Sequence, residues 1–338
     1  MTGLDFRSIY GHEHIIEHLK RAVSEDKVSH AYIFHGEDES GKMMLAESFA
    51  QNLLCETSPS ERLDGDCCNR CRSCLQVKSH NHPDLIYITH EKASIGVDDI
   101  RNQLNSDIMI KPYQSERKIY IIDEAEKMTE GAQNALLKTI EEPPAYATIL
   151  LLVNNITALL PTILSRCVEL DLRPVAKETI KMMLMDKYQV PDYLAEVSAV
   201  FSGGNVGKAI QFVTSEDFAK TKDYVIELVT KIFDYRVYEV IEKIKELGEE
   251  KTRISNYLDL CMMWYRDVLI YKATECEKNL IFLDEVRTIR GQSQSLSYEK
   301  IEKIMKAMDQ AKVRLKANVN FDIVMEMMLL TIKENEND

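Results

Sequence analysis

The stretch that most constrains the fold is residues 118–126, a short apolar run that ends in two adjacent acids and then becomes helical in pattern. The run reads Lys-Ile-Tyr-Ile-Ile, which is typical of a strand buried on both faces of a parallel sheet. Such a strand would deliver Asp123 and Glu124 to the edge of the sheet, where one acid could hold Mg²⁺ and the other could orient a water molecule. The alternative is a core strand followed by a helix whose first turn favours acids for dipole reasons alone.

A loop upstream of this strand is the second informative feature. A strand candidate at residues 29–34 runs directly into residues 36–42, which read Gly-Glu-Asp-Glu-Ser-Gly-Lys. The spacing G-x4-G-K between a strand and a helix is typical of loops whose backbone N–H groups hold phosphates while the lysine reaches the terminal ones. The candidate nucleotide-binding residues of the loop and the acidic strand are Gly36, Gly41, Lys42, Asp123 and Glu124.

The loop departs from a catalytic one at the residue after the lysine. Met43 stands where a serine or threonine hydroxyl is needed to coordinate Mg²⁺, and a thioether is a weak ligand for this ion. Three acids and no glycine between Gly36 and Gly41 also make a poor cradle for anions. We therefore favour a vestigial loop, kept for its fold, over ATP turnover, while binding of ATP or ADP through backbone amides stays open.

Cysteines cluster in one short segment, because five of the eight in the chain lie within residues 55–74. In a reducing compartment such a cluster indicates a metal site rather than disulfides. Two consecutive C-x2-C steps and one earlier cysteine supply four thiolates, which predicts a closed, tetrahedral, structural zinc site. The predicted ligands are Cys55, Cys68, Cys71 and Cys74.

Three neighbouring residues could rival these ligands. Cys67 could replace Cys68, although only Cys68 gives both spacings of two residues. His80 and His82 are close in sequence, but their position beside Pro83 fits better with capping of the strand that follows. The remaining alternative is a set of free thiols in a loop.

Further strand candidates alternate with helical patterns up to about residue 170. These strands are expected at residues 84–88, 148–153 and 168–170. A helix is expected at residues 132–140, and the Glu-Glu-Pro-Pro turn at 141–144 ends it. Asn154 follows the strand at residues 148–153, where its side chain could sense a phosphate or form a simple turn. The alternation predicts a doubly wound parallel sheet whose site lies at the carboxyl ends of the strands.

After residue 174 the strand candidates disappear and only helical patterns remain. Helices are expected at residues 175–187 and 191–201, at a short segment opened by 203–209, and in long amphipathic stretches from about residue 215. Residues 291–295 (Gly-Gln-Ser-Gln-Ser) predict a polar loop between two of them. Residues 264–267 (Trp-Tyr-Arg-Asp) are interpreted as core or interface.

The length and the net charge of the chain limit the number of domains and the classes of function that are compatible with it. A chain of 338 residues is longer than the chains that usually pack around a single hydrophobic core, so two or three domains are expected. The net charge of −13 argues against a protein that grips nucleic acid alone through a broad basic face, including a zinc-dependent DNA binder. No apolar run approaches the roughly 20 residues of a membrane span. The first residues also lack the pattern of a signal peptide, so we expect a cytoplasmic protein without a membrane partner.

Together these residues resemble the bacterial DNA polymerase III clamp-loader subunits, a family of the AAA+ class. The most specific parts of the resemblance are residues 134–144, which end in Glu-Glu-Pro-Pro, and Leu-Ser-Arg-Cys at 164–167. The resemblance covers nearly the whole chain. It implies an α/β N-terminal doubly wound parallel sheet of AAA+ type, followed by an all-α lid and an all-α C-terminal collar. The implied domains are residues 1–172 with the zinc module inserted at 55–74, the lid at 173–212, and the oligomerisation collar at 213–338.

Within that family the chain is closer to the delta-prime branch than to the ATP-hydrolysing gamma/tau branch. Met43 replaces the Mg²⁺-binding hydroxyl, and Gly207 stands where gamma/tau subunits carry a nucleotide-sensing arginine, with Lys208 beside it. We also expect no tau-type tail after Asp338. The resemblance thus implies a largely non-hydrolysing accessory subunit of a DNA-directed DNA polymerase holoenzyme, with the gamma/tau-type motor as the alternative.

The resemblance also implies a role for Arg166. In this family the arginine of Ser-Arg-Cys points into the ATP site of a neighbouring subunit, where its fixed charge stabilises the transferring phosphoryl group. Without the resemblance, an arginine that caps or pairs at a strand start would be preferred. The implied partners are the gamma/tau-type ATPase and delta subunits, with the sliding clamp and primer-template DNA contacted through the complex.

Overall fold

The computed structural model describes residues 5–90, 93–249, 254–277, 280–317 and 319–334. The chain forms two compact units, one of residues 1–179 with 204–208 and the other of residues 180–203 with 209–338. The expected division into a sheet domain, a lid and a collar stays a prediction. Among the described residues, no helix is both long and apolar enough to cross a membrane.

The first unit is built on a parallel sheet of five strands in the order β2-β3-β4-β1-β5. The strands are β1 (Ala31–His35), β2 (Leu85–Ile88), β3 (Lys118–Ile122), β4 (Ala147–Val153) and β5 (Val168–Asp171). Every residue of β3 and of β4 is buried, as expected for strands covered on both faces. The predicted doubly wound sheet is therefore confirmed.

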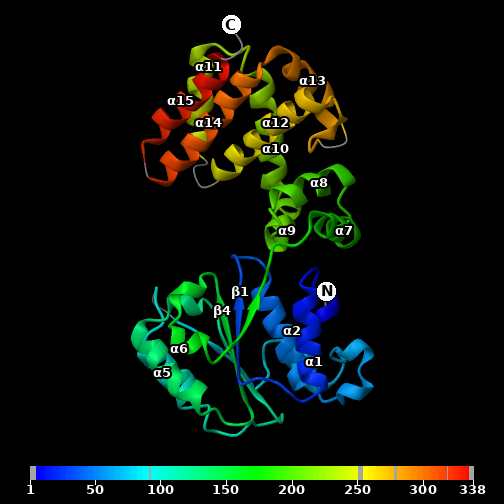
Figure 1. The fold of residues 1–338 in the computed structure, drawn as a ribbon, viewed down its shortest axis with the longest axis vertical. Coiled ribbons are helices and arrows are strands. Elements are labelled where there is room, and N and C mark those ends of the chain that lie inside the picture. The colour runs from blue at the N-terminus through cyan, green and yellow to red at the C-terminus, as the bar shows by residue number, and fades with distance from the viewer. Residues whose placement is uncertain (1–4, 91–92, 250–253, 278–279, 318, 335–338) are drawn as a thin grey trace. The chain divides into compact units, whose positions relative to one another are not determined.

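Helices cover both faces of this sheet (Figure 1). They are α1 (Glu13–Ser24), α2 (Lys42–Leu54), α3 (Arg72–Lys78), α4 (Val97–Ile100), α5 (Glu130–Glu141) and α6 (Pro161–Leu164). Alternate residues of β3 pack into two different apolar clusters. Ile119 and Ile121 pack with residues of α1 and α2. Tyr120 and Ile122 pack with residues of α5. The period of two along each strand thus produces two apolar layers.

The register of the strands gathers the predicted nucleotide-binding residues at one edge. His35 at the end of β1 pairs with Val153 at the end of β4, so the loop after β1 and Asn154 leave the sheet together. Ile122 pairs with Leu151, so the acids after β3 leave at the same edge. This arrangement follows from parallel pairing, because carboxyl ends of parallel strands meet on one side.

The described part of the second unit contains helices and no strand. Its elements are α7 (Lys177–Tyr188) from its fourth residue, α8 (Asp192–Phe201), α9 (Val206–Thr214) from its fourth residue, α10 (Glu216–Lys231), α11 (Val237–Glu249), α12 (Ile254–Thr274), α13 (Val286–Ser295), α14 (Tyr298–Lys316) and α15 (Phe321–Glu334). Trp264, Tyr265 and Asp267 of α12 are fully buried, which confirms their interpretation as core.

The predicted polar loop at residues 291–295 is wrong, because α13 continues through Ser295. Gln292 is 7% exposed, accepts a hydrogen bond from Trp264 Nε1 at 2.8 Å, and donates one to the carbonyl oxygen of Val229 at 2.8 Å. A run of polar residues predicts a loop only if water solvates it. Here one side chain supplies both a donor and an acceptor to buried partners.

We predict that Gln292→Ala lowers the free energy of unfolding by on the order of 2–3 kcal/mol, because it leaves the indole N–H and the Val229 carbonyl buried without partners. Urea denaturation followed by circular dichroism measures the loss. Gln294→Ala is the matched control, since Gln294 is exposed on the same helix. Equal effects of the two substitutions would contradict the account.

Candidate functional site

The loop at residues 36–42 connects β1 to α2, as its sequence predicted. Gly41 has φ of 98°, a left-handed conformation that favours glycine, and α2 begins at the next residue. The backbone N–H of Gly36 donates to the carbonyl of Val153 at 3.2 Å, which ties the start of the loop to β4. The strand, the loop and the helix N-terminus thus have the connectivity of a phosphate-binding loop.

Lys42 makes its hydrogen bonds inside the protein. Its Nζ donates to the carbonyl oxygens of Gly36 at 3.0 Å and Glu37 at 2.6 Å, and to Oδ1 of Asn154 at 2.6 Å. An ammonium group has three N–H donors, so all three are engaged without a phosphate. Burial lowers the pKa of Lys42, whereas nearby carboxylates, with Asp38 the strongest, oppose that shift. The lysine is 8% exposed, and a phosphate could reach it only after one of these bonds breaks.

The two acids after β3 face different partners. Glu124 Oε2 lies 2.6 Å from Lys127 Nζ and 3.5 Å from His90 Nε2, and the hydrogen bond from Lys127 lowers the pKa of Glu124. Asp123 Oδ1 accepts from the backbone N–H of Glu124 at 2.9 Å. The charge of Asp123 is one of those that oppose the lowering of the Lys42 pKa by burial. Strand register puts Asp123, which follows Ile122, at the same edge of the sheet as the loop, while an ion pair engages Glu124.

A segment distant in sequence packs on the loop, which sequence reasoning missed. Asn205 Nδ2 donates to the carbonyl of Asp38 at 2.7 Å, and the backbone N–H of Gly207 donates to the carbonyl of Glu39 at 3.1 Å. Lys208 Nζ lies 3.2 Å from Glu37 Oε2. A Cβ atom added at Gly207 would lie 2.4 Å from the oxygen of Glu39, so the approach requires glycine.

The four predicted zinc ligands come together. Sulfur atoms of Cys55, Cys68, Cys71 and Cys74 all lie within 4.8 Å of one another, and Cys67 lies outside this group. The backbone N–H of Cys71 donates to Cys68 Sγ at 3.3 Å, and that of Cys74 donates to Cys71 Sγ at 3.4 Å. Such N–H groups stabilise thiolates, and four thiolates suit a tetrahedral structural metal site. The set could bind one metal ion, for which zinc fits best by its donor chemistry.

The rival histidines are engaged elsewhere. His82 Nδ1 accepts from the backbone N–H of Asp84 at 3.1 Å, next to the start of β2, which confirms its predicted capping role. His80 Nδ1 lies 3.2 Å from the hydroxyl of Tyr87. Neither histidine belongs to the cysteine group among the described residues.

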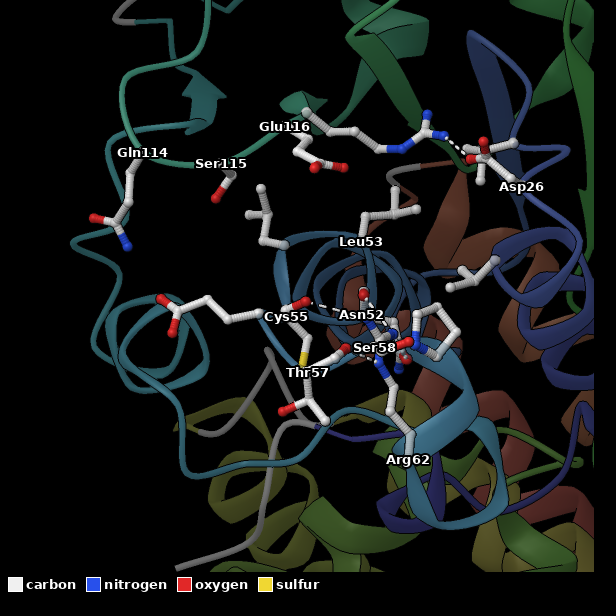
Figure 2. A pocket seen from close by; sticks show the side chains of 16 residues that line it. Asp26, Asn52, Leu53, Cys55, Thr57, Ser58, Arg62, Gln114, Ser115 and Glu116 are labelled. Carbon is white, nitrogen blue, oxygen red and sulfur yellow. Dashed lines mark hydrogen bonds and ion pairs between the residues drawn. The ribbon is translucent and has the colours of Figure 1, made fainter.

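Arg62 ties the cysteine module to the end of α2 (Figure 2). Its guanidinium donates to the carbonyl oxygens of Thr57 at 2.8 Å, Asn52 at 2.8 Å and Cys55 at 3.1 Å. The last carbonyls of a helix lack intrahelical partners, so this arginine supplies donors that α2 needs. The module is thereby held to the helix that also carries Lys42 at its start.

A cavity of about 460 Å³ opens beside this end of α2. Figure 2 shows Ser115 and Glu116 on one side of it and Leu53 and Asn52 on the other. Cys55 lines the cavity, but none of the predicted nucleotide-binding residues does. The cavity therefore belongs to the surroundings of the cysteine module.

Arg166 follows α6 and lies at the surface, with 39% of its side chain exposed. One terminal nitrogen donates to the carbonyl of Thr162 at 3.0 Å and to Ser165 Oγ at 3.2 Å. The other lies 3.0 Å from Glu141 Oε1. Val168, two residues after Arg166, pairs with Tyr32 near the start of β1, whereas the loop at residues 36–42 follows the end of β1. Arg166 therefore lies toward the amino ends of the strands and the chain's own lysine toward their carboxyl ends.

We predict that Gly207→Ala loosens the loop at residues 36–42, because the added methyl group must displace the backbone of Glu39. Hydrogen exchange of the loop amides should accelerate by at least about tenfold. Gly291→Ala is the control, since an added Cβ there meets nothing beyond the adjoining backbone of its own helix, and it should leave exchange in the loop unchanged. Unaltered exchange in the Gly207 variant would refute the packing argument.

We predict about one equivalent of zinc in the purified chain, lost in Cys68→Ser and kept in Cys67→Ser. These adjacent cysteines differ in whether their sulfur joins the four-thiol group. Plasma mass spectrometry measures the metal, and chelation should accelerate hydrogen exchange at residues 55–78. Equal zinc contents in the two variants would show that the ligand set is wrong.

Two family models and a known protein that match this chain all belong to DNA polymerase III subunits. Residues 11–176 match the family model described as "DNA polymerase III, delta subunit", and residues 226–334 match "DNA polymerase III, delta subunit, C terminal". The chain is 29% identical to DNA polymerase III subunit delta' of Bacillus subtilis, over 95% of each chain.

Relatives of the tau and gamma type are also similar. Identity to DNA polymerase III subunit tau of Bacillus subtilis is 27%, over 98% of this chain and 63% of that protein. Identity to subunit tau/gamma of Haemophilus influenzae is 33%, over 57% of this chain and 26% of that protein. With two family models matched at successive parts of the sequence and a doubly wound sheet followed by helices, the chain belongs to the DNA polymerase III clamp-loader subunit family, of the AAA+ class and the delta-prime type.

Proposed function

We propose that this clamp-loader subunit hydrolyses little or no ATP itself and supplies Arg166 in trans to the ATP site of a neighbouring gamma/tau-type subunit. The observation that carries the proposal is a contrast between two cations. Lys42 is buried, with three hydrogen bonds to its own chain, whereas Arg166 lies at the surface. Arg166 is therefore the cation that is accessible to a neighbouring subunit, whereas Lys42 is bonded within its own chain.

Transfer of the γ-phosphoryl group spreads negative charge over its oxygen atoms, and an arginine from a neighbour can stabilise that charge. A guanidinium has five N–H donors, of which Arg166 uses three in the bonds described above. Its exposed ion pair with Glu141 contributes at most about 1 kcal/mol, and two N–H groups of the guanidinium remain for a phosphate. These properties suit a residue that acts on a partner's substrate.

The alternative is an ATP-hydrolysing motor of the gamma/tau type. Gly41, Lys42 and Asp123 favour it, because they keep the form of a phosphate-binding loop with an acid at the same edge of the sheet. Met43 disfavours it, since no hydroxyl follows the lysine to coordinate Mg²⁺. ADP or ATP could still bind through backbone amides without being hydrolysed.

The proposed partners are the gamma/tau-type ATPase and delta subunits of the same complex. Sliding clamp and primer-template DNA would be contacted through that complex, which agrees with a net charge of −13 on this chain. Zinc at the four cysteines would hold residues 55–74 together and would take no part in hydrolysis.

We predict that Arg166→Ala leaves the complex assembled but lowers its ATP turnover. The loss at the affected site should be on the order of a thousandfold, and the rate that remains should come from other sites. Steady-state phosphate release by the reconstituted complex measures the effect. Arg173→Ala is the control, because Arg173 is also exposed and pairs with an acid, Asp171. Unchanged turnover with Arg166→Ala would rule out the role in trans.

We also predict that the isolated chain, mixed with ATP and Mg²⁺, shows no turnover above a Lys42→Ala variant. The lysine is already saturated with internal partners and no hydroxyl follows it. Steady hydrolysis that depends on Lys42 would instead support the motor alternative.

A further inference from the structure

We propose that Glu141 is a positioning residue for Arg166, one that holds the guanidinium ready for a neighbour's phosphate. The inference rests on the proposed function, since it concerns how an arginine supplied in trans is presented. Glu141 is the last residue of α5 and carries an exposed carboxylate 3.0 Å from a terminal nitrogen of Arg166.

The backbone that carries this carboxylate is held by the way α5 ends. The backbone N–H of Glu142 donates to the carbonyl of Lys138 at 3.2 Å, and Glu142 itself has left the helical conformation. Pro143 and Pro144 follow, and a proline restricts both its own φ angle and the residue before it. The helix therefore ends at Glu141, the residue whose carboxylate meets Arg166.

The arginine is fixed from the other side by α6. Ile163 of α6 and Ile140 of α5 are both buried in the same apolar cluster, so the two helix ends share one core. Arg166 then donates to the carbonyl of Thr162 and to Ser165 Oγ, both in the same turn. The backbone that carries each partner is thus tied to one apolar cluster, while both side chains are exposed.

Three contacts on one guanidinium restrict a long side chain to few orientations. An arginine left free would lose that freedom only when it docked on the neighbour, which would weaken its effect on the transition state. Two of its five N–H donors remain for phosphate oxygens while Glu141 and the α6 turn hold the other three. Glu141 acts here as a support for Arg166 rather than as a competitor for it.

The test compares the reconstituted complex carrying Glu141→Ala with wild type and with Glu142→Ala. Glu142 is the matched control because it is the adjacent exposed acid and makes no ion pair with Arg166. We expect Glu141→Ala to lower kcat for ATP by about three- to tenfold with KM unchanged. Glu141→Gln keeps an oxygen that can accept a hydrogen bond, so it should recover part of the loss, and Glu142→Ala should match wild type.

A double variant separates positioning from a general effect on the fold. If Glu141 acts through Arg166, then Glu141→Ala should cause no further loss once Arg166→Ala is present. An equal loss in both backgrounds would overturn the inference, and so would a rise in kcat, which would make Glu141 a competitor. Size-exclusion chromatography of each complex confirms assembly.

The same experiment distinguishes this inference from the function on which it rests. If Arg166→Ala lowers turnover but Glu141→Ala behaves like Glu142→Ala, the positioning role fails and the arginine role stands. If Arg166→Ala leaves turnover unchanged, the proposed function fails and the positioning role fails with it.

Discussion

The account depends on the three hydrogen bonds of the Lys42 ammonium group. Two go to carbonyl oxygens of the loop that precedes it, and the third goes to Asn154 at the end of the neighbouring strand. A buried ammonium group must have partners, and here the protein provides all of them. A phosphate would have to displace one, and with Met43 as the next residue there is no hydroxyl to bring Mg²⁺ to it.

The rest of the first unit keeps that loop in place. Parallel pairing of β1 with β4 brings the loop and Asn154 to one edge, and Gly207 packs against the backbone of Glu39. At the other end of α2, Arg62 holds the cysteine module to the helix carbonyls. One helix therefore joins a saturated lysine to a four-thiol site, whereas Arg166 belongs to the opposite layer of the sheet with α5 and α6.

Much of the fold and of the candidate site was predictable, because short local patterns in the sequence indicate them. A strand buried on both faces is apolar throughout, as β3 and β4 are, and the spacing of Cys68, Cys71 and Cys74 indicates a metal site directly. The contacts that were missed join residues far apart in the chain, such as Gly207 with Glu39, or depend on a surface orientation, such as Glu141 with Arg166. The wrong prediction at residues 291–295 arose because polarity alone does not distinguish a solvated loop from a helix whose glutamine serves buried partners.

The most direct test of the central claim is the ATP turnover of the reconstituted complex when this chain carries Lys42→Ala. If the chain's own loop takes no part in hydrolysis, a correctly assembled complex with that substitution should turn over ATP within about twofold of wild type, because the neighbouring site still receives its arginine. A loss as large as that caused by removing the arginine would contradict the account, since it would mean that Lys42 serves a working ATP site.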